Sequence, residues 1–471
     1  MRASKVFLGI LLAAPWNIAQ AQKEQPLPKD LPPYGSQQPL RVREVKVSRL
    51  DNGLTVWLVP QPGLPKVAYS ITVRGGLAAD LKDRPGLSEL LASTLDQGTK
   101  SRSARQIAEE LQATGGDFAA EGGPDSISIN TTVLSAKADA ALEVLADVFE
   151  NASFPESEVS LAKRNLADSL RQREASPEFL ARRALAKALY KDNAYSIIAP
   201  TQDSIEKSTA AELRQEFARR FRPDQALFVA VGDFDEAKMT ALVRQKLGSW
   251  SAPKTEPVAD ALKPAGPAPH AVFVVPRPGS VQTVLALGAF GPLRGDADYE
   301  STAVANAIYG GTFSSRLVSN IREDKGYTYS PGSRVQTLRA AGVLRTQAAV
   351  RNAVTAASLN EIAYELNRMV TTSPTDEELT KAKRYLSGIQ AIQLQSRESV
   401  ARAVASLWVD GLPSETLSLY GQKIGKVTAA DVDAAAQKYF PASRMTVVAV
   451  GEEKLIRDSL APYGIPIQPA P

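Results

Sequence analysis

Apolar and polar residues alternate along several short runs in the first third of the chain, the pattern of half-buried strands. The run VKVSRLDNGLTVWLV, residues 45–59, alternates on both sides of Asp51-Asn52-Gly53 and predicts a β-hairpin. The runs KVAYSITV and SISINTTV, residues 66–73 and 126–133, also carry apolar side chains at alternate positions. Each run predicts a strand that packs one face on a core.

Between these strands the apolar spacing changes to three and four residues, which predicts helices. In GLSELLASTLDQGT, residues 86–99, four leucines at i, i+3, i+4 and i+8 form one apolar face. A second helix begins after Ser103, where Gln106 completes a capping box, and ends at Gly115-Gly116. A long helical pattern follows Pro155. The sequence therefore predicts an α+β domain with helices packed on a mixed or antiparallel sheet.

The chain repeats this plan in its second half. Three pairs of segments correspond: VPQPG at 59–63 with VPRPG at 275–279, TAAEL at 209–213 with TAADV at 428–432, and FRPDQALFVAVGD at 221–233 with FPASRMTVVAVGE at 440–452. Their offsets of 216, 219 and 219 residues are nearly constant. Ordered repeats of this kind indicate two domains of common origin.

A proline-rich run, SAPKTEPVADALKPAGPAPH at 251–270, separates the two copies. Its composition predicts a semi-extended linker. We expect one domain over residues 40–250 and a second, built in the same way, over residues 271–471.

The N-terminus has the features of a secretory signal over residues 1–21. Arg2 and Lys5 are its basic start, residues 6–14 its apolar segment, and Ala19-Gln20-Ala21 its cleavage site. The apolar segment is too short to span a bilayer. We therefore expect a periplasmic or otherwise exported protein without a transmembrane segment.

Charge and composition narrow the chemistry. Removal of Arg2 and Lys5 leaves 53 basic and 51 acidic side chains, so no basic footprint for nucleic acid is present. The chain has no cysteine and one histidine, His270, at the end of the proline-rich run, where we expect it to face solvent. A catalytic zinc usually needs three protein ligands, so an independent zinc site is not expected.

The helix at 86–99 nevertheless has the frame of a metal site. Opposite its leucines lie Glu89, Ala92 and Ser93, at the spacing of a two-histidine zinc helix. The residues at the three ligand and base positions are Glu, Ala and Ser instead of His, Glu and His.

These motifs resemble the M16 metallopeptidases, the family of pitrilysin, insulin-degrading enzyme and the mitochondrial processing peptidase. LDNGLTVWLV, GLSELLASTLDQGT and FPESEV appear in family order in the first half, and YGGTFSSRLVSNIREDKGYTYS, residues 309–330, in the second. The length is that of a two-domain M16B subunit. The resemblance implies two homologous ferredoxin-like α/β-roll domains joined by the proline-rich linker, and a chamber enclosed by two subunits.

The chain departs from the family at its zinc motif, His-x-x-Glu-His. The two histidines would fall at Glu89 and Ser93, and the general-base glutamate at Ala92. The family's third ligand, a glutamate some seventy residues on, falls in KRNLADSL, where the only carboxylate is Asp168. An alanine cannot activate water, so the resemblance implies a degenerate site without a metal.

In the second half, IREDKGYTY predicts a helix that ends at Gly326 and a strand that follows. Arg322 would lie in the last helical turn and Tyr329 would be the third strand residue. M16 proteins use an arginine and a tyrosine at this spacing to bind substrate and stabilise the charge that develops during hydrolysis. The ordinary alternatives are a surface ion pair of Arg322 with Glu323 or Asp324, and strand packing of Tyr329.

Gly310 and Gly311 precede the same helix. Two glycines allow close backbone approach or positive φ, and the resemblance also implies substrate contact; a plain turn is the equal alternative. Ser314, Ser315 and Arg316 favour helix capping and packing.

The sequence thus predicts the zinc-free subunit of a heterodimeric M16B peptidase, without activity or cofactor of its own. Its partner would carry zinc and His-x-x-Glu-His, and this chain would hold an extended peptide and supply Arg322 and Tyr329. Two alternatives remain open: a structural or assembly protein, and a peptide-binding module that does not cleave. An enzyme of another kind is disfavoured by the single histidine.

Overall fold

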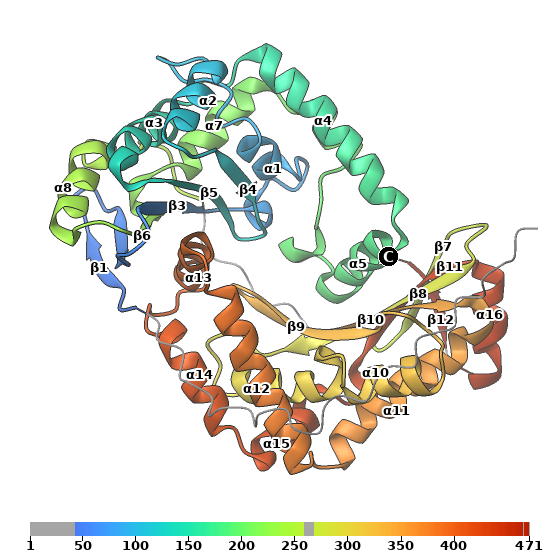
Figure 1. Cartoon of the computed structure of the whole chain (residues 1–471). Helices are drawn as coiled ribbons and strands as arrows, with labels where there is room; N and C mark the ends of the chain where they lie inside the picture. Colours follow the sequence, from blue (N-terminus) through green and yellow to red (C-terminus); the bar gives the residue numbers. More distant parts are fainter. Residues whose placement is uncertain (1–42, 259–267, 465, 471) are drawn as a thin grey trace, which may run out of the picture. The chain divides into compact units, whose positions relative to one another are not determined.

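Two six-stranded mixed sheets, one in each half of the chain, form the centre of the part that the structure describes. The computed structural model describes residues 43–258, 268–464 and 466–470, and Leu40–Pro471 is one compact unit (Figure 1). The predicted signal segment at 1–21 lies outside the described residues, as does the middle of the predicted linker, 259–267.

The first sheet has the order β1-β2-β6-β3-β5-β4. Its strands are β1 Lys46–Arg49, β2 Thr55–Pro60, β3 Lys66–Arg74, β4 Ala119–Gly122, β5 Ser126–Leu134 and β6 Ala226–Gly232. β1 and β2 form the predicted antiparallel hairpin, and β2 pairs in parallel with β6. The predicted alternation on β3 is confirmed, because its alternate apolar residues all lie in one core cluster: Val67, Tyr69, Ile71 and Val73.

The second sheet has the order β12-β7-β11-β8-β10-β9. Its strands are β7 Val272–Pro276, β8 Gln282–Gly291, β9 Gly332–Leu338, β10 Ala341–Arg351, β11 Thr446–Gly451 and β12 Ile467–Pro469. Five strands follow the first sheet in order and direction. The sixth strand, at the edge of each sheet, differs between the two. In the first sheet it is β1, which pairs antiparallel with β2 in a hairpin, and in the second it is β12, which pairs in parallel with β7.

Helices cover both sheets. In the first half they are α1 Leu87–Ala92, α2 Ala104–Ala113, α3 Ala138–Asn151, α4 Glu156–Ala175, α5 Pro177–Tyr190, α6 Gln202–Lys207, α7 Ala210–Arg220 and α8 Glu236–Leu247. In the second half they are α9 Tyr299–Asn306, α10 Arg316–Val318, α11 Thr355–Thr371, α12 Asp376–Gln393, α13 Arg397–Val409, α14 Thr416–Lys426, α15 Ala429–Tyr439 and α16 Glu453–Leu460. None of the described helices is long and apolar enough to cross a membrane.

The repeated sequence motifs fold into equivalent local structures. The two TAA motifs begin α7 and α15, and each start is a capping box, formed by Thr209 with Glu212 and by Thr428 with Asp431. Each box satisfies two backbone N–H groups that a helix start leaves free. The predicted capping box of Ser103 with Gln106 is also confirmed.

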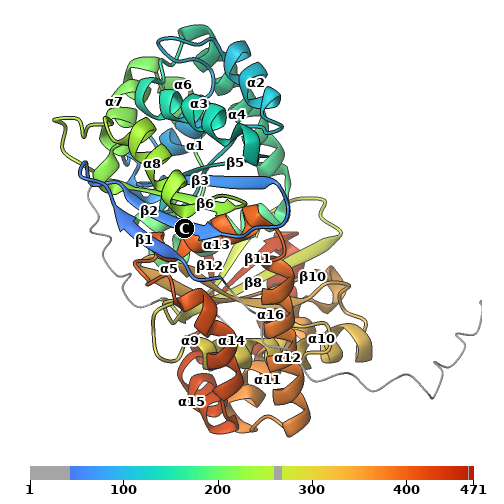
Figure 2. The ribbon, with the colours of Figure 1, turned by 60° about the vertical axis from the view of Figure 1, so that its left-hand side comes forward.

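Each sheet is covered on one face by a helix from the other half. α5 packs on β7, β8 and β11 of the second sheet (Figure 1). In return, α13 packs on β3, β5 and β6 of the first sheet (Figure 2). The second contact is apolar: Ala401, Val404 and Leu407 of α13 share a buried cluster with Leu227 and Val229 of β6. The two halves therefore complete each other's cores.

We expect Leu407→Ala to lower the free energy of unfolding by about 2–5 kcal/mol, because it leaves a cavity in this shared core. Leu407 is fully buried, whereas Leu419 on the neighbouring α14 is 43% exposed. Leu419→Ala is the matched control and should change stability by less than about 1 kcal/mol. Denaturant unfolding measures both, and equal effects would contradict the proposed importance of the α13 contact.

Candidate functional site

A buried arginine network holds the start of α1, the helix with the zinc-site frame. The Asp80 carboxylate accepts hydrogen bonds from the backbone N–H groups of Gly86 (2.8 Å) and Ser88 (3.1 Å). Arg220 is fully buried and donates to Asp80 and to Glu216, each at 2.8 Å. Burial raises the pKa of Asp80, while Arg220 and the backbone donors oppose the rise. The network fixes where α1 begins and which face it presents.

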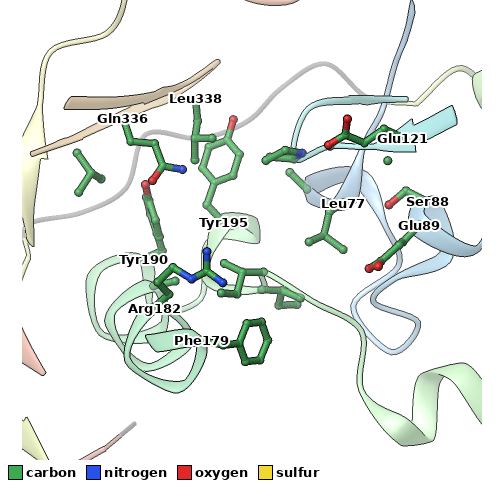
Figure 3. Close-up of a pocket in the computed structure, with 18 of the residues that line it drawn as sticks. Leu77, Ser88, Glu89, Glu121, Phe179, Arg182, Tyr190, Tyr195, Gln336 and Leu338 are labelled. Carbon is green, nitrogen blue, oxygen red and sulfur yellow. The ribbon is translucent and has the colours of Figure 1, made fainter. Parts of the chain in front are cut away.

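That face lines a cavity of about 570 Å³. Glu89, Ala92 and Ser93 all contribute to its wall, and Figure 3 shows Ser88 and Glu89 at one side of it. Ser93 Oγ donates to the Leu90 carbonyl at 2.9 Å, as an ordinary helix serine does. The Glu89 carboxylate lies 3.0 Å from the guanidinium of Arg173 on α4. The three positions are therefore together, as predicted, and one of them is held in an ion pair.

The remaining walls of the cavity come from both halves of the chain. β4 contributes Glu121, α5 contributes Arg182, and the second sheet contributes Arg334, Gln336 and Arg345. Apolar side chains fill the space between them: Leu77, Phe179, Leu185, Leu189, Leu338 and Val343. Gly288 on β8 lets α5 approach, since a Cβ there would lie 3.0 Å from Leu189. The cavity is thus a mixed apolar and charged pocket.

Arg322 and Tyr329 lie outside this cavity wall and are in contact with each other. The guanidinium carbon of Arg322 is 5.0 Å from the centre of the Tyr329 ring. Arg322 also forms the alternative surface ion pair, 3.3 Å from Glu323. Tyr329 is 83% exposed, so the strand-packing alternative does not apply to it.

The predicted strand at Tyr329 is wrong. The helical turns Ser319–Asp324 end before Gly326, which takes a φ of +60°, as predicted for the helix end. The next strand, β9, begins only at Gly332. Thr328 makes one isolated bridge to Val350 and donates its hydroxyl to the Ala349 carbonyl at 2.6 Å. This anchor holds the segment against β10 while Tyr329 points into solvent.

Phe313 is a site residue that the sequence reasoning missed. Its ring centre lies 4.2 Å from the Arg322 guanidinium carbon, so Arg322 contacts two aromatic rings. Phe313 is 68% exposed, unusual for a large apolar side chain. Phe313 and Arg322 are nine residues apart in the sequence, a separation that matches no helical or strand period. The sequence pattern therefore gives no sign that the two side chains are in contact. We call Phe313, Arg322 and Tyr329 the aromatic-arginine patch.

Gly310 and Gly311 have a packing role. They end a wide helical turn, Ala307–Gly311, and neither has a positive φ. A Cβ on Gly310 would lie 2.9 Å from Cβ of Ser333, and one on Gly311 would lie 2.8 Å from the Asn306 amide nitrogen. Close packing of Gly310 against β9 and of Gly311 against the end of α9 therefore accounts for both glycines, and the contact with substrate stays a prediction.

An ion pair anchors the segment between these glycines and Arg322. Arg316 is bonded by both arms of its guanidinium to Glu378 on α12, at 2.7 and 2.9 Å. The Arg316 hydrogen bond lowers the pKa of Glu378 to about 2. Ser315 caps α10, so the predicted capping and packing roles of these two residues are confirmed.

Comparison with known proteins identifies the family. Residues 55–201 match the family model described as Insulinase (Peptidase family M16), and residues 207–386 match the one described as Peptidase M16 inactive domain. The chain belongs to the M16 peptidase family. Its two halves are M16-type domains, as predicted.

Individual relatives agree with this assignment. The chain is 26% identical over 361 residues to the Uncharacterized zinc protease YmxG of Bacillus subtilis, covering 75% of this chain and 86% of that protein. A Pseudomonas fluorescens structure described as a peptidase M16 inactive domain has a TM-score of 0.81 at 24% identity, with 87% and 98% coverage. A Helicobacter pylori protease has the same TM-score at 20% identity, covering 87% of this chain and 100% of that one.

The residues at the M16 zinc position do not fit a metal. Glu89 is neutralised by Arg173, Ala92 has no ligand atom, and Ser93 donates into its own helix. Within residues 43–258, 268–464 and 466–470, no group of three His, Cys, Asp or Glu side chains could hold an ion. The only histidine of the sequence, His270, is exposed, and its Nδ1 lies 3.1 Å from the Met445 carbonyl oxygen. The side chains at the zinc-motif positions of this M16 chain are therefore not those of a metal site.

Arg173, rather than Asp168, faces the zinc-motif helix. Asp168 is 62% exposed and is bonded to Arg171 on the outer side of α4. Arg173 reaches Glu89 from the same helix. A cation thus stands beside the first ligand position of the motif, where it repels a metal ion instead of binding it.

We expect restoration of the motif alone to fail. Glu89→His, Ala92→Glu and Ser93→His together should bind no stoichiometric zinc, because Arg173 remains beside the first ligand. Addition of Arg173→Glu should give about one zinc per chain, since it supplies the third ligand. Metal analysis after dialysis measures both proteins, with circular dichroism as the control for folding. Equal zinc binding with and without Arg173→Glu would contradict this placement.

The Arg316–Glu378 pair predicts an acid dependence of stability. The folded pKa of Glu378, about 2, lies below its usual 4.5, so the stabilisation is complete above pH 4.5 and is lost as pH falls toward 2. Glu378→Gln should cost about 2–4 kcal/mol at pH 7, because it also leaves the buried Arg316 unpaired.

The control is Glu377→Gln. Glu377 is 74% exposed and pairs with Lys381 on the surface, so its loss should cost less than about 1 kcal/mol. Urea unfolding at several pH values follows both variants. A difference between wild type and Glu378→Gln that stays constant from pH 7 to pH 2.5 would refute the assignment.

Proposed function

We propose that this chain is the zinc-free subunit of a two-chain M16 peptidase of the M16B type, and that its aromatic-arginine patch acts at the zinc site of the partner. The observation that carries the proposal is the contrast between the two candidate sites. The chain's own zinc position is neutralised by Arg173, whereas Arg322 and Tyr329 remain together and accessible.

The patch is suited to bind and stabilise an anion outside this chain. Zinc-assisted hydrolysis of a peptide builds negative charge on the scissile carbonyl oxygen. A guanidinium and a phenol hydroxyl can stabilise this charge when both are fixed before the reaction. Phe313 supports Arg322 from one side, and the Thr328 anchor holds the segment that carries Tyr329. Exposure of the two rings supports a role at a surface that another chain covers.

The rest of the proposal follows from the sequence. The partner carries zinc and the His-x-x-Glu-His motif, the substrate is a peptide or an unfolded polypeptide, and the pair is heterodimeric. Export to the periplasm or another compartment outside the cytoplasm rests on Arg2, Lys5 and the apolar segment that follows them. A structural or assembly role is the second candidate, and the experiment below separates the two.

The test uses the complex reconstituted from this chain and a zinc-bearing M16 partner. Arg322→Ala and Tyr329→Phe should each lower kcat by roughly a hundred- to thousandfold, the loss found when one donor to a developing oxyanion is removed. Tyr329→Phe keeps the ring next to Arg322 and removes only the hydroxyl. Sizing of each complex shows whether assembly is unchanged.

Tyr364→Phe is the matched control. Tyr364 is also an exposed tyrosine, 56% accessible, on α11, and its variant should keep wild-type kcat. Intact complexes with wild-type kcat/KM in both Arg322→Ala and Tyr329→Phe would favour the structural role. Activity of the partner that does not change when this chain is omitted would refute the proposed function as a whole.

A further inference from the structure

Three arginines from three elements meet at one end of the cavity beside α1. Arg182 comes from α5, Arg334 from β9 and Arg345 from β10, and all three line the cavity. Arg334 and Arg345 are direct partners in the register of the two antiparallel strands. Like charges opposite each other on neighbouring strands destabilise a sheet, so this arrangement needs a reason.

The charge of the three arginines is not neutralised by the described part of the chain. No carboxylate in that part forms an ion pair with any of the three, whereas most other buried arginines have one, such as Arg220 and Arg316. Arg345 is only 9% exposed; it donates to Gln347, and its Nε–H has no hydrogen-bond partner among the residues that the structure describes. A buried charged donor without a partner is costly to a fold.

Electrostatics supports the same conclusion. Burial, together with the nearby Arg334 and Arg182, lowers the pKa of Arg345 to about 10. The guanidinium therefore stays charged at neutral pH although its surroundings disfavour the charge. An anion bound next to it would remove this penalty.

The two glutamates of the cavity wall do not serve as that anion. Glu89 is paired with Arg173, and Glu121 is exposed on β4. Figure 3 shows both glutamates on the side of α1 and β4, with Arg182 and Gln336 on the other side. The two glutamates and the Glu89–Arg173 pair thus lie at one side of the cavity and Arg182 at the other, with apolar side chains between them.

Two unpaired strand edges also border the cavity. β4 is the last strand of the first sheet and β9 the last strand of the second, and residues of both line the cavity, among them Glu121 and Gln336. An edge strand presents free backbone N–H and C=O groups that an extended chain can pair with. A ligand with its own peptide backbone and a carboxylate matches both features.

We propose that this cavity binds the carboxylate of an extended peptide, either its C-terminus or an acidic side chain, through Arg182, Arg334 and Arg345. Guanidinium groups bind a carboxylate with charge-assisted, often bidentate, hydrogen bonds. The site lies in this chain alone, so the proposal stands or falls separately from the role of Arg322 and Tyr329.

The first experiment titrates the full chain, without a partner, with synthetic peptides by calorimetry. One octapeptide of neutral apolar residues has a free C-terminal carboxylate, and its matched control has a C-terminal amide. A second amidated pair carries one internal Glu or, as its control, Gln. We expect at least one carboxylate peptide to bind about ten- to a hundredfold more tightly than its neutral control. This ratio of dissociation constants is the one expected from the free energy of hydrogen bonds to a charged group. The pair that shows the difference identifies the source of the carboxylate. Equal binding within both pairs would overturn the proposal.

The second experiment tests the arginines. Arg182 and Arg334 are exposed, so Arg182→Met and Arg334→Met should fold normally and each weaken binding of the carboxylate peptide about tenfold or more. Arg105→Met removes a positive charge from an 86% exposed side chain on α2 and should leave binding unchanged. Wild-type affinity in both pocket variants would rule out the site.

Arg345→Met separates binding from structure. Because the charge of Arg345 is unfavourable in the free protein, its removal should raise the melting temperature while binding is lost. An arginine with a structural role gives the opposite result, a lower melting temperature, and would contradict the proposal. Arg345→Lys keeps the charge but not the planar fork, so it should restore binding only in part.

Discussion

The reciprocal packing of α5 and α13 is the contact on which the rest of this structure depends. In the described part of the chain, each sheet has one face that is covered by a helix from the other half of the sequence. The first sheet receives Val404 and Leu407 from α13, and the second receives Leu185 and Leu189 from α5. Burial of these side chains is favourable only when both halves are folded, so the exchange makes the two domains one cooperative unit. The exchange also sets the position of the cavity. α5 follows directly after α4, which carries Arg173, and it brings Arg182 to the second sheet.

The loss of the zinc motif has left an ordered site rather than a void. Asp80 and Arg220 still fix the start of α1, and its leucines still pack into the core. The cavity side differs in charge from a metal site: Arg173 neutralises Glu89, and no carboxylate among the described residues pairs with Arg334 or Arg345 of the second sheet. The family frame is therefore retained as architecture, and the cavity wall next to it carries the arginines for which we propose a carboxylate ligand.

Much of the fold could be predicted from the sequence, because its signals are local. The hairpin at 45–59, the alternation of Val67 to Val73 and the capping box of Ser103 each depend on neighbours a few residues away. The matching segments that begin at Thr209 and Thr428 also helped to make the internal repeat visible. The prediction of a strand at Tyr329 was wrong because this segment makes only one isolated bridge, between Thr328 and Val350, before β9 begins. That bridge is a tertiary contact, which no local sequence pattern encodes.

Only part of the candidate sites could be predicted from the sequence, because only that part consists of residues close together along the chain. Glu89, Ala92 and Ser93 share one helix turn, so their spacing could be read directly. Arg173 is separated from Glu89 by 84 residues, and the Arg182–Arg334–Arg345 cluster joins α5 to two strands of the other half. Such groups are invisible until the topology is known. Phe313 likewise becomes a neighbour of Arg322 only through the turns that connect them.

The exchange of α5 and α13 also has a consequence for biosynthesis. β6, the last strand of the first sheet to be made, ends at Gly232, whereas the helix that covers its face begins at Arg397. At common elongation rates of about 5–20 residues per second, that apolar face waits on the order of 10–30 s for its cover. During this interval Leu227 and Val229 are available to other nascent chains. The half-finished sheet thus presents an uncovered apolar face until α13 is made, and a fragment that contains only the first half is expected to aggregate rather than to persist as a free domain.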